Sequence, residues 1–346
     1  MSFPRLTPLV FLTLSVLSGC AGDAVVPEPK PEIVAFIARD AKTRITWFYT
    51  SDIDGKNLVR ISAVSAPTTN KIAVARSGRF LFYTGKSGSE LPLMVFDATA
   101  GTVRALGTAT AVFPTLSPDG SRVAWFEMLA GQFSLVTCNS DGTGRMVLVE
   151  SNGERSIRVE AAPAWSPDGS NIAFSAMDTT SRNAAGPVPH VINVANKTVT
   201  RYRTPDGTAA PQWLSNDVIV YLVGDRGAFS LVRYQLSTGA DTTITTSLPT
   251  LNSRMISVSP DRSTIVCANP LTIVDIASGA VKVLASNDAT IHDHMWSTSG
   301  NEFVYGDRTS NTLYTDRLYR MSKRGESLAL PAIDTLGSSS SAVWLR

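Results

Sequence analysis

Three histidines occur in the 346-residue chain, and two of them are separated by a single residue. The spacing in His292-Asp293-His294 places both imidazoles on one face if the segment is an extended strand. Imidazole is a common ligand for zinc and manganese, so this pair could hold one divalent ion. Alternatively, the two side chains simply line a surface or channel. Both hypotheses stay open, and His190, the third histidine, lies far away in the sequence.

Three aspartates recur in the same local sequence, directly after Ser-Pro. They are Asp119, Asp168 and Asp261, and glycine follows the first two as Gly120 and Gly169. Proline fixes φ for a turn, aspartate hydrogen-bonds the backbone ahead of it, and glycine adopts a positive φ at little cost. Repetition of one carboxylate at one place in a repeat indicates a structural turn. We therefore interpret these aspartates as turn formers, not as catalytic acids.

Other reactive patterns are incomplete. The segment from Asp52 resembles the start of a calcium loop, but Ala63 occupies the twelfth position, where such a loop needs glutamate. The sequence contains neither a Gly-x-Ser-x-Gly elbow nor a phosphate-binding Gly-x-x-x-x-Gly-Lys motif. Cys138 and Cys267 fall in different predicted repeats, and we expect two buried thiols without a disulfide. No complete catalytic set emerges from these patterns.

The elements that would position these residues are strands joined by tight turns. The clearest copy covers residues 162–175, and others cover 114–126, 255–267, 72–83, 211–221 and 295–305. Their turns lie near positions 78, 120, 169, 217, 262 and 300, which gives steps of 42, 49, 48, 45 and 38 residues. An all-strand period of this length is typical of a β-propeller.

Each repeat contains two further strands after the hairpin, so we predict an all-β propeller with four antiparallel strands per blade. The chain begins out of phase, because residues 33–61 match only the second, third and fourth strands. At the other end, residues 341–346 match a first strand. Joining these two ends into one blade would close the ring and remove two exposed sheet edges. We predict seven blades over one domain, residues 33–346, with six blades as the alternative.

The N-terminus has the layout of a secretion signal: Arg5 precedes an apolar run from Leu9 to Leu17. The following Leu-Ser-Gly-Cys resembles the lipobox of bacterial lipoproteins, which implies cleavage after residue 19 and lipid attachment at Cys20. Ala21 next to this cysteine suggests an outer-membrane lipoprotein facing the periplasm or the cell surface. Residues 20–32 are rich in proline and predict an extended tether.

Charge is sparse. Charged residues make up 17% of the chain and the formal net charge is +2, with no basic cluster. This composition argues against a nucleic-acid partner. We expect a monomeric propeller without a cofactor other than the lipid, and any membrane contact through that anchor alone.

The repeated Trp-Ser-Pro-Asp-Gly-Ser-x-Ile-Ala-Phe pattern, from Trp165 to Phe174, resembles the propeller repeats of the TolB, tricorn protease and dipeptidyl-peptidase families. In the TolB family such a propeller binds peptide and protein partners in the periplasm. Because the sequence also predicts a lipid anchor with a tether and offers no complete catalytic set, we expect a non-catalytic envelope protein that binds a protein, peptide or glycan through the channel mouth and loops. The alternative is a metal-dependent polysaccharide lyase, because the position of His292 and His294 is similar to the histidine-rich mouth of oligogalacturonate lyase. That family implies three histidines and a glutamine, whereas Ala289 stands where the glutamine would be expected.

Overall fold

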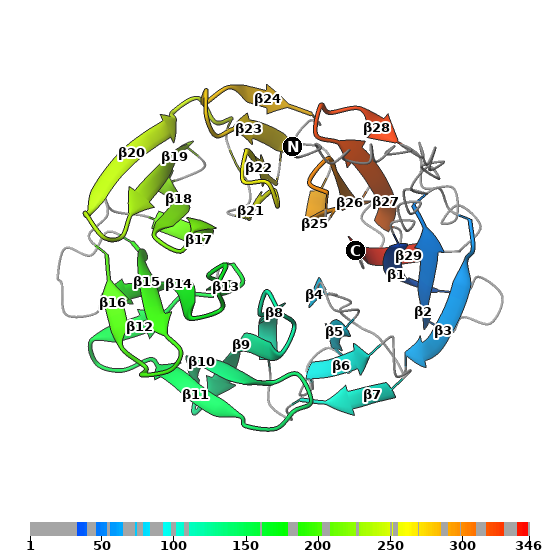
Figure 1. Cartoon of the computed structure of the whole chain (residues 1–346), viewed down its shortest axis with the longest axis horizontal. Coiled ribbons are helices and arrows are strands. Elements are labelled where there is room, and N and C mark those ends of the chain that lie inside the picture. Colours follow the sequence, from blue (N-terminus) through cyan, green and yellow to red (C-terminus); the bar gives the residue numbers. More distant parts are fainter. Residues whose placement is uncertain are drawn as a thin grey trace, which may run out of the picture. The chain divides into compact units, whose positions relative to one another are not determined.

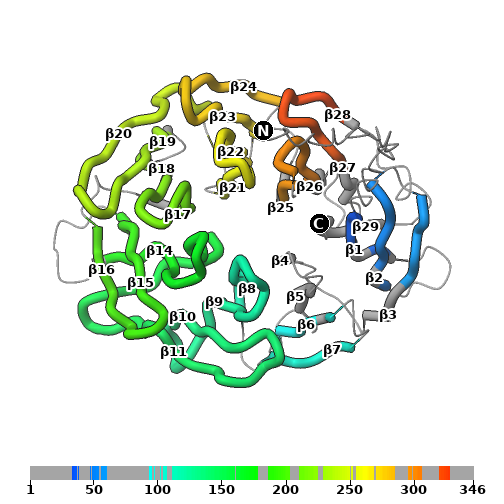
Figure 2. Tube along the Cα trace, viewed as in Figure 1, coloured from blue at the N-terminus to red at the C-terminus, as the bar shows by residue number. Residues whose placement is uncertain are grey.

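The structure is a computed structural model, and it describes most of the chain from Ile33 onward (Figure 2). The described residues are 33–39, 46–53, 56–64, 73–74, 79–83, 93–97, 102–106, 111–159, 161–178, 186–202, 208–225, 228–249, 251, 255–268, 270–284, 290–297, 299–308, 316–328 and 338–344. They belong to one compact unit, Glu32–Arg346. The predicted signal peptide, Cys20 and the tether lie outside the described residues.

The described residues form strands and turns in six antiparallel sheets, without a helix. One sheet contains β4 (Ala73–Val74), β5 (Arg79–Tyr83), β6 (Leu93–Asp97) and β7 (Thr102–Ala105). The next contains β8 (Ala111–Leu116), β9 (Arg122–Leu129), β10 (Gln132–Asn139) and β11 (Met146–Glu150). A third contains β12 (Arg155–Ile157), β13 (Ala164–Trp165), β14 (Asn171–Asp178), β15 (Val188–Asn193) and β16 (Val199–Arg201).

Two more sheets follow the same order along the chain. One contains β17 (Thr208–Ser215), β18 (Val218–Asp225), β19 (Ala228–Gln235) and β20 (Ala240–Thr245). The other contains β21 (Ile256–Val258), β22 (Thr264–Cys267), β23 (Thr272–Asp275) and β24 (Val281–Val283). The all-β class and the antiparallel sheets expected from the sequence are confirmed. Among the described residues, the structure contains no helical segment that could span a membrane.

The last sheet has eight strands and combines the two ends of this unit. It contains β25 (Thr290–Trp296), β26 (Glu302–Arg308), β27 (Asp316–Ser322), β28 (Ser327–Leu328), β29 (Ser338–Trp344), β1 (Ile33–Arg39), β2 (Thr46–Asp52) and β3 (Val59–Val64). β29 pairs with β1 from Val34↔Trp344 to Arg39↔Ser338, whereas β27 meets β29 only at Asp316↔Ser339. The C-terminal strand therefore pairs along its length with the N-terminal strands.

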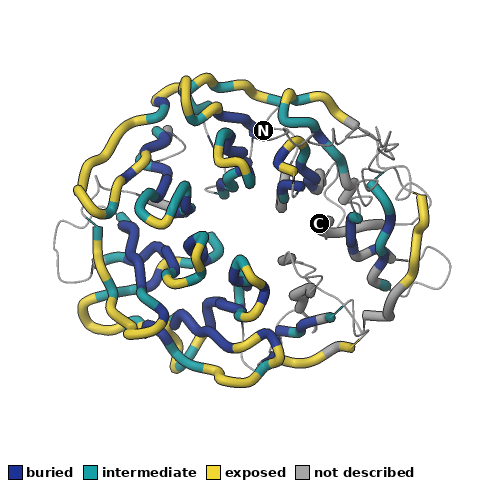
Figure 3. The backbone as a smooth tube through the Cα atoms, in the orientation of Figure 1, coloured by how far each residue is buried: buried dark blue, intermediate teal, exposed yellow. Residues whose placement is uncertain are grey.

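The sheets follow one another in chain order around a common centre, and β8, β13, β17, β21 and β25 are the strands of their sheets that lie nearest to it (Figure 1). The second strands β9 and β22 are buried along most of their length, because their side chains pack in clusters shared with neighbouring sheets (Figure 3). In β9, Trp125 packs in a cluster with Leu93 of β6, and the adjacent Phe126 packs with Phe174 of β14. Burial of such a side chain contributes about 2–3 kcal/mol. The core thus consists of a series of inter-sheet clusters.

One strand differs from the expectation. The first strand around Trp165 is split into β12 and β13, and both pair with β14. The Arg158 N–H still donates to the Ser175 carbonyl at 3.0 Å, just beyond β12. Pro163 has no N–H to continue the ladder, which fits the break before β13.

Candidate functional site

The innermost strands are interrupted near one position in three of the sheets. In each case the strand has one extra residue relative to its partner, between 112 and 115 in β8, 209 and 212 in β17, and 291 and 294 in β25. Such a bulge leaves one residue outside the ladder and redirects the strand. The recurrence places irregular backbone at the centre of the arrangement, where the strands approach one another (Figure 1).

Two of these bulges contain a non-glycine residue at positive φ. Phe113 has φ 52° and Ala210 has φ 54°, and each precedes a proline, Pro114 or Pro211. This conformation costs a side-chain-bearing residue about 1–2 kcal/mol. The sequence reading missed both bulges, although the recurring X-Pro at the start of these strands was the available signal.

The predicted metal-binding pair, His292 and His294, lies in the bulge of β25 and directly after it. Ile291 pairs with Asp307 and His294 pairs with Tyr305, so two residues of β25 oppose one residue of β26. The extra residue interrupts the two-residue alternation on which the spacing argument depended. The His-x-His spacing alone therefore does not place both imidazoles on one face, and metal binding stays a prediction.

His190 lies elsewhere and belongs to the core. It is 3% exposed in β15, its ring stacks on Phe174 with centroids 5.4 Å apart, and its Nδ1 lies 3.0 Å from the Val188 carbonyl oxygen. Within the described ranges, no three or more His, Cys, Asp or Glu side chains are arranged to hold a metal ion. A site at His292 and His294 would need ligands other than His190.

The Asp168 carboxylate is held inside its own turn. It accepts hydrogen bonds from the Ser166 hydroxyl at 2.6 Å and from the Ser170 N–H at 3.0 Å, while Ser166 Oγ accepts from the Asn171 N–H at 2.9 Å. Gly169 follows at φ 71°. Partial burial acts to raise the pKa of Asp168, but the hydrogen bonds from Ser166 and Ser170 outweigh it and the pKa lies below its ordinary value.

Asp119 makes the same contacts in its sheet. It accepts from the hydroxyls of Ser117 at 2.5 Å and Ser121 at 2.7 Å, and these bonds lower the pKa of Asp119 from 3.8 to about 2. Gly120 has φ 70°. A carboxylate with so low a pKa carries no proton at neutral pH, so it is a poor general acid.

Asp261 repeats the pattern with one addition. Its carboxylate accepts from the Ser259 hydroxyl at 2.6 Å and from Lys323 Nζ at 2.6 Å. Partial burial acts to raise the pKa of Asp261, but the hydrogen bonds from Lys323, Ser259 and Ser263 outweigh it and hold the pKa well below its ordinary value. Lys323 follows β27, so this turn also joins two sheets.

Both described cysteines are free, buried thiols in separate sheets, Cys138 in β10 and Cys267 in β22. Burial raises the pKa of Cys138 to about 11 and that of Cys267 to about 12. Since the thiolate is the nucleophilic form, both are unreactive at neutral pH.

Comparison with known proteins gives the fold. No protein-family model and no curated protein sequence matches the chain. Among solved structures, TolB from Acinetobacter baumannii matches with a TM-score of 0.52 and 15% identity, over 91% of this chain and 66% of that chain. An oligogalacturonate lyase in complex with manganese matches with a TM-score of 0.57 and 13% identity, over 86% of this chain and 83% of that chain. Puromycin hydrolase matches with a TM-score of 0.62 and 16% identity, over 90% of this chain and 53% of that chain.

The lyase and the hydrolase carry different activities on one scaffold, and identities this low transfer the scaffold alone. The chain covers 66% of the TolB chain and about half, 53%, of puromycin hydrolase. Together with the antiparallel sheets around a common centre, the similarities show that this chain has a β-propeller fold, similar to that of the TolB structure.

Proposed function

We propose that this chain is a non-catalytic lipoprotein of the cell envelope whose propeller binds a protein, peptide or glycan at the centre of the ring. In this proposal the ring has seven blades, and β29 closes it by completing the blade that begins with β1. Two observations support the closure: the pairing of β29 with β1 along the strand, and the seven first-strand copies in the sequence.

The observation that carries the binding proposal is the recurring bulge of the innermost strands. Each of these strands is an edge of its sheet and pairs on one side only, so its other side already presents unpaired backbone groups. The bulge adds backbone groups outside the ladder and re-aims neighbouring side chains. Backbone strain of the kind at Phe113 and Ala210 concentrates at binding sites. Three bulged strands around one centre could contact one partner together.

Site-specific photocrosslinking in the native envelope tests this proposal. A photoreactive residue at Gln212, in the bulged innermost strand β17, is expected to form a discrete adduct with the partner. The same residue at Arg104, exposed on the outer strand β7, is the matched control and is expected to form none. Equal adducts from both positions, or an adduct from Arg104 only, would contradict binding at the centre.

The anchor is tested separately. Lipidation at Cys20 predicts that the chain fractionates with membranes and incorporates labelled fatty acid. The Cys20→Ser variant should lose the label and become soluble, because the tether of residues 20–32 has no other means of attachment in this proposal. Retention of the variant in the membrane fraction would refute a purely lipid anchor.

A metal-dependent polysaccharide lyase is the second candidate, and two observations favour it. The fold matches an oligogalacturonate lyase in complex with manganese, and His292 and His294 lie at a bulge of an innermost strand. Two imidazoles suit manganese or zinc, but the third histidine, His190, is committed to the core. The described donor set is thus smaller than the resemblance implies.

Metal analysis of the purified protein separates the two candidates. Stoichiometric manganese, zinc or calcium that is lost in a His292→Ala/His294→Ala double variant would favour the lyase and lead to assays on acidic polysaccharides. A metal-free protein, with a double variant of unchanged stability, would exclude this metal site.

A further inference from the structure

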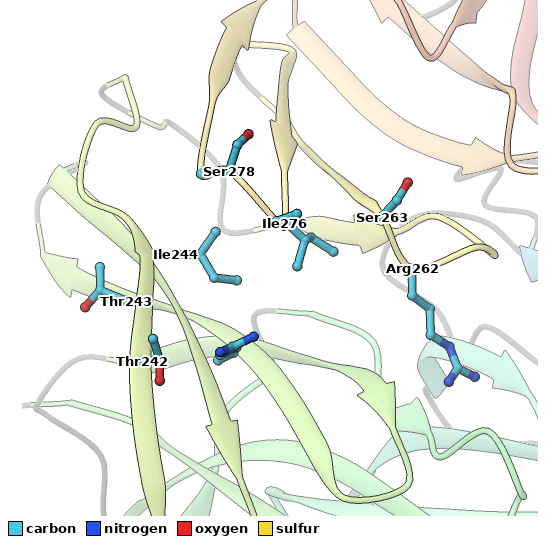
Figure 4. A pocket seen from close by; sticks show the side chains of 10 residues that line it. Thr242, Thr243, Ile244, Arg262, Ser263, Ile276 and Ser278 are labelled. Atoms are coloured by element: carbon cyan, nitrogen blue, oxygen red, sulfur yellow. The ribbon is translucent and has the colours of Figure 1, made fainter.

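A cavity of about 620 Å³ lies between two neighbouring sheets, away from the bulged strands (Figure 4). One wall comes from β19 and β20, with Arg233, Thr242, Thr243 and Ile244. The opposite wall comes from two turns of the next sheet, with Arg262, Ser263 and residues 276–279. Cavities of about 300–1,000 Å³ are typical of small-molecule sites.

The two walls are fixed relative to each other. Ile244 and Ile276, both half-buried, belong to one hydrophobic cluster that spans the two sheets, and they form the apolar part of the lining. Gly279 lies at φ 70° so close to the Ile244 carbonyl oxygen that a Cβ would overlap it. The Ile276 N–H donates to the Ser263 carbonyl at 2.9 Å and joins the two turns. The cavity is therefore preformed.

The charge of the lining is positive. Arg233 and Arg262 are its ionisable side chains, and no carboxylate belongs to it. The nearby Asp275 already accepts from the Ser278 N–H and hydroxyl at 2.8 and 2.6 Å, and Asp261 already accepts from Lys323. Over the described part of the chain, neither guanidinium makes a hydrogen bond or ion pair. Two unneutralised guanidinium groups at one cavity favour an anion.

The position of Arg262 adds an independent argument. At the equivalent turn position other repeats have Gly120, Gly169 and Gly300, with φ of 70°, 71° and 71°. Arg262 adopts the same left-handed region, with φ 57°. This backbone region disfavours side-chain-bearing residues, and strain of this kind is concentrated at functional sites. A long cation therefore replaces glycine in the Ser-Pro-Asp turn that lines this cavity.

We propose that this cavity binds a small molecule carrying an oxyanion, either a carboxylate or a phosphate, through Arg233 and Arg262. The planar guanidinium matches both anions with paired N–H donors. Thr242, which lies opposite Arg233 in the strand pairing, adds a hydroxyl, and the two isoleucines accept the apolar face of the ligand. This site is independent of partner binding at the centre of the ring.

Isothermal titration calorimetry of the purified full-length protein tests this inference in a phosphate-free buffer. The titrants are inorganic phosphate, D-glucuronate and, as the neutral counterpart of glucuronate, D-glucose. We expect one site per chain for phosphate or glucuronate, and no heat with glucose. Binding of glucuronate alone identifies a carboxylate ligand, and binding of phosphate alone identifies a phosphate ligand.

The variants separate binding from folding. Arg262→Gly restores the residue that other repeats use, so it should keep or raise the thermal midpoint while weakening anion binding about tenfold or more. Arg233→Gln should weaken binding by a similar factor, and Arg104→Gln, on a different sheet, should leave it unchanged. Failure of the wild type to bind either anion, or equal affinities in the wild type and both pocket variants, would overturn the proposal.

Discussion

The turns around Asp168 and Asp261 have nearly the same sequence but make different contacts with neighbouring sheets. Both begin with Ser-Pro-Asp, and in both the carboxylate accepts from the serine two residues before it at 2.6 Å. The Asp168 turn packs Gly169 near Pro118 of the preceding sheet. The Asp261 turn instead places Arg262 at a cavity and receives Lys323 from another sheet. Local chemistry builds the turn, and the neighbouring sheets determine its further role.

The largest expected difference is between Gly169, in the Asp168 turn, and Gly279, in the turn between β23 and β24 that lines the same cavity as Arg262. Gly169 and Gly279 have φ of 71° and 70°, but a Cβ at Gly169 would meet only Pro118 Cδ at 3.9 Å, whereas at Gly279 it would overlap the Ile244 carbonyl. Gly169→Ala should therefore cost about 1 kcal/mol of unfolding free energy. Gly279→Ala should cost about 3 kcal/mol or more, because strain and overlap add. Urea denaturation measures both, and equal losses would contradict the difference in packing.

The two turn serines should behave alike. Ser166 and Ser259 are 0% and 1% exposed, and each hydroxyl donates to the aspartate and accepts a backbone N–H five residues ahead, at 2.9 Å and 3.0 Å. Ser166→Ala and Ser259→Ala should each lower the unfolding free energy by about 1–2 kcal/mol. Ser121→Ala, on the exposed side of a third turn, serves as the control with a smaller loss. Unequal losses for the two buried serines would show that the turns differ locally as well.

The pH dependence of the unfolding free energy in acid tests the role of the turn carboxylates. The pKa of Asp119 falls from 3.8 to about 2 on folding, so the folded state favours the ionised form. Its contribution to stability is complete above the unfolded pKa and is lost as the pH falls from about 4 toward 2. Asp119→Asn should flatten this part of the stability profile and shift the acid midpoint by a few tenths of a pH unit. If the unfolding free energy of Asp119→Asn depended on pH below 4 as that of the wild type does, Asp119 would not be the source of the acid sensitivity.

The smallest expected effect is the loss of the ion pair between Lys323 and Asp261, which has no counterpart in the Asp168 turn. Lys323 and Asp261 are partly exposed, at 29% and 46%, so Lys323→Gln should cost only about 0.5 kcal/mol and less in high salt. A double-mutant cycle with Asp261→Asn isolates the pair. Coupling that does not change with salt would contradict an ion pair screened by solvent.

The sequence was most informative where local chemistry decides the structure. Ser-Pro-Asp-Gly predicted the turns, and the position of each segment within the repeat predicted strands such as β9 and β10. The match of the C-terminal segment to a first strand predicted its pairing with β1, which the structure contains. The sequence was less informative at the candidate site. The bulge at His292 depends on the pairing of β25 with β26, and the burial of His190 depends on its contact with Phe174. Neither the bulge nor the burial of His190 can be predicted from the spacing of residues in the sequence.

By itself the sequence determined the all-β class, the period of the repeat and the chemistry of each turn, because these follow from hydrogen bonds and φ preferences within a few residues. Only the tertiary structure decided that Arg233 and Arg262 line one cavity and that Lys323 reaches Asp261. Those pairs are 29 and 62 residues apart, and they meet because the sheets pack side by side in a fixed order around a common centre.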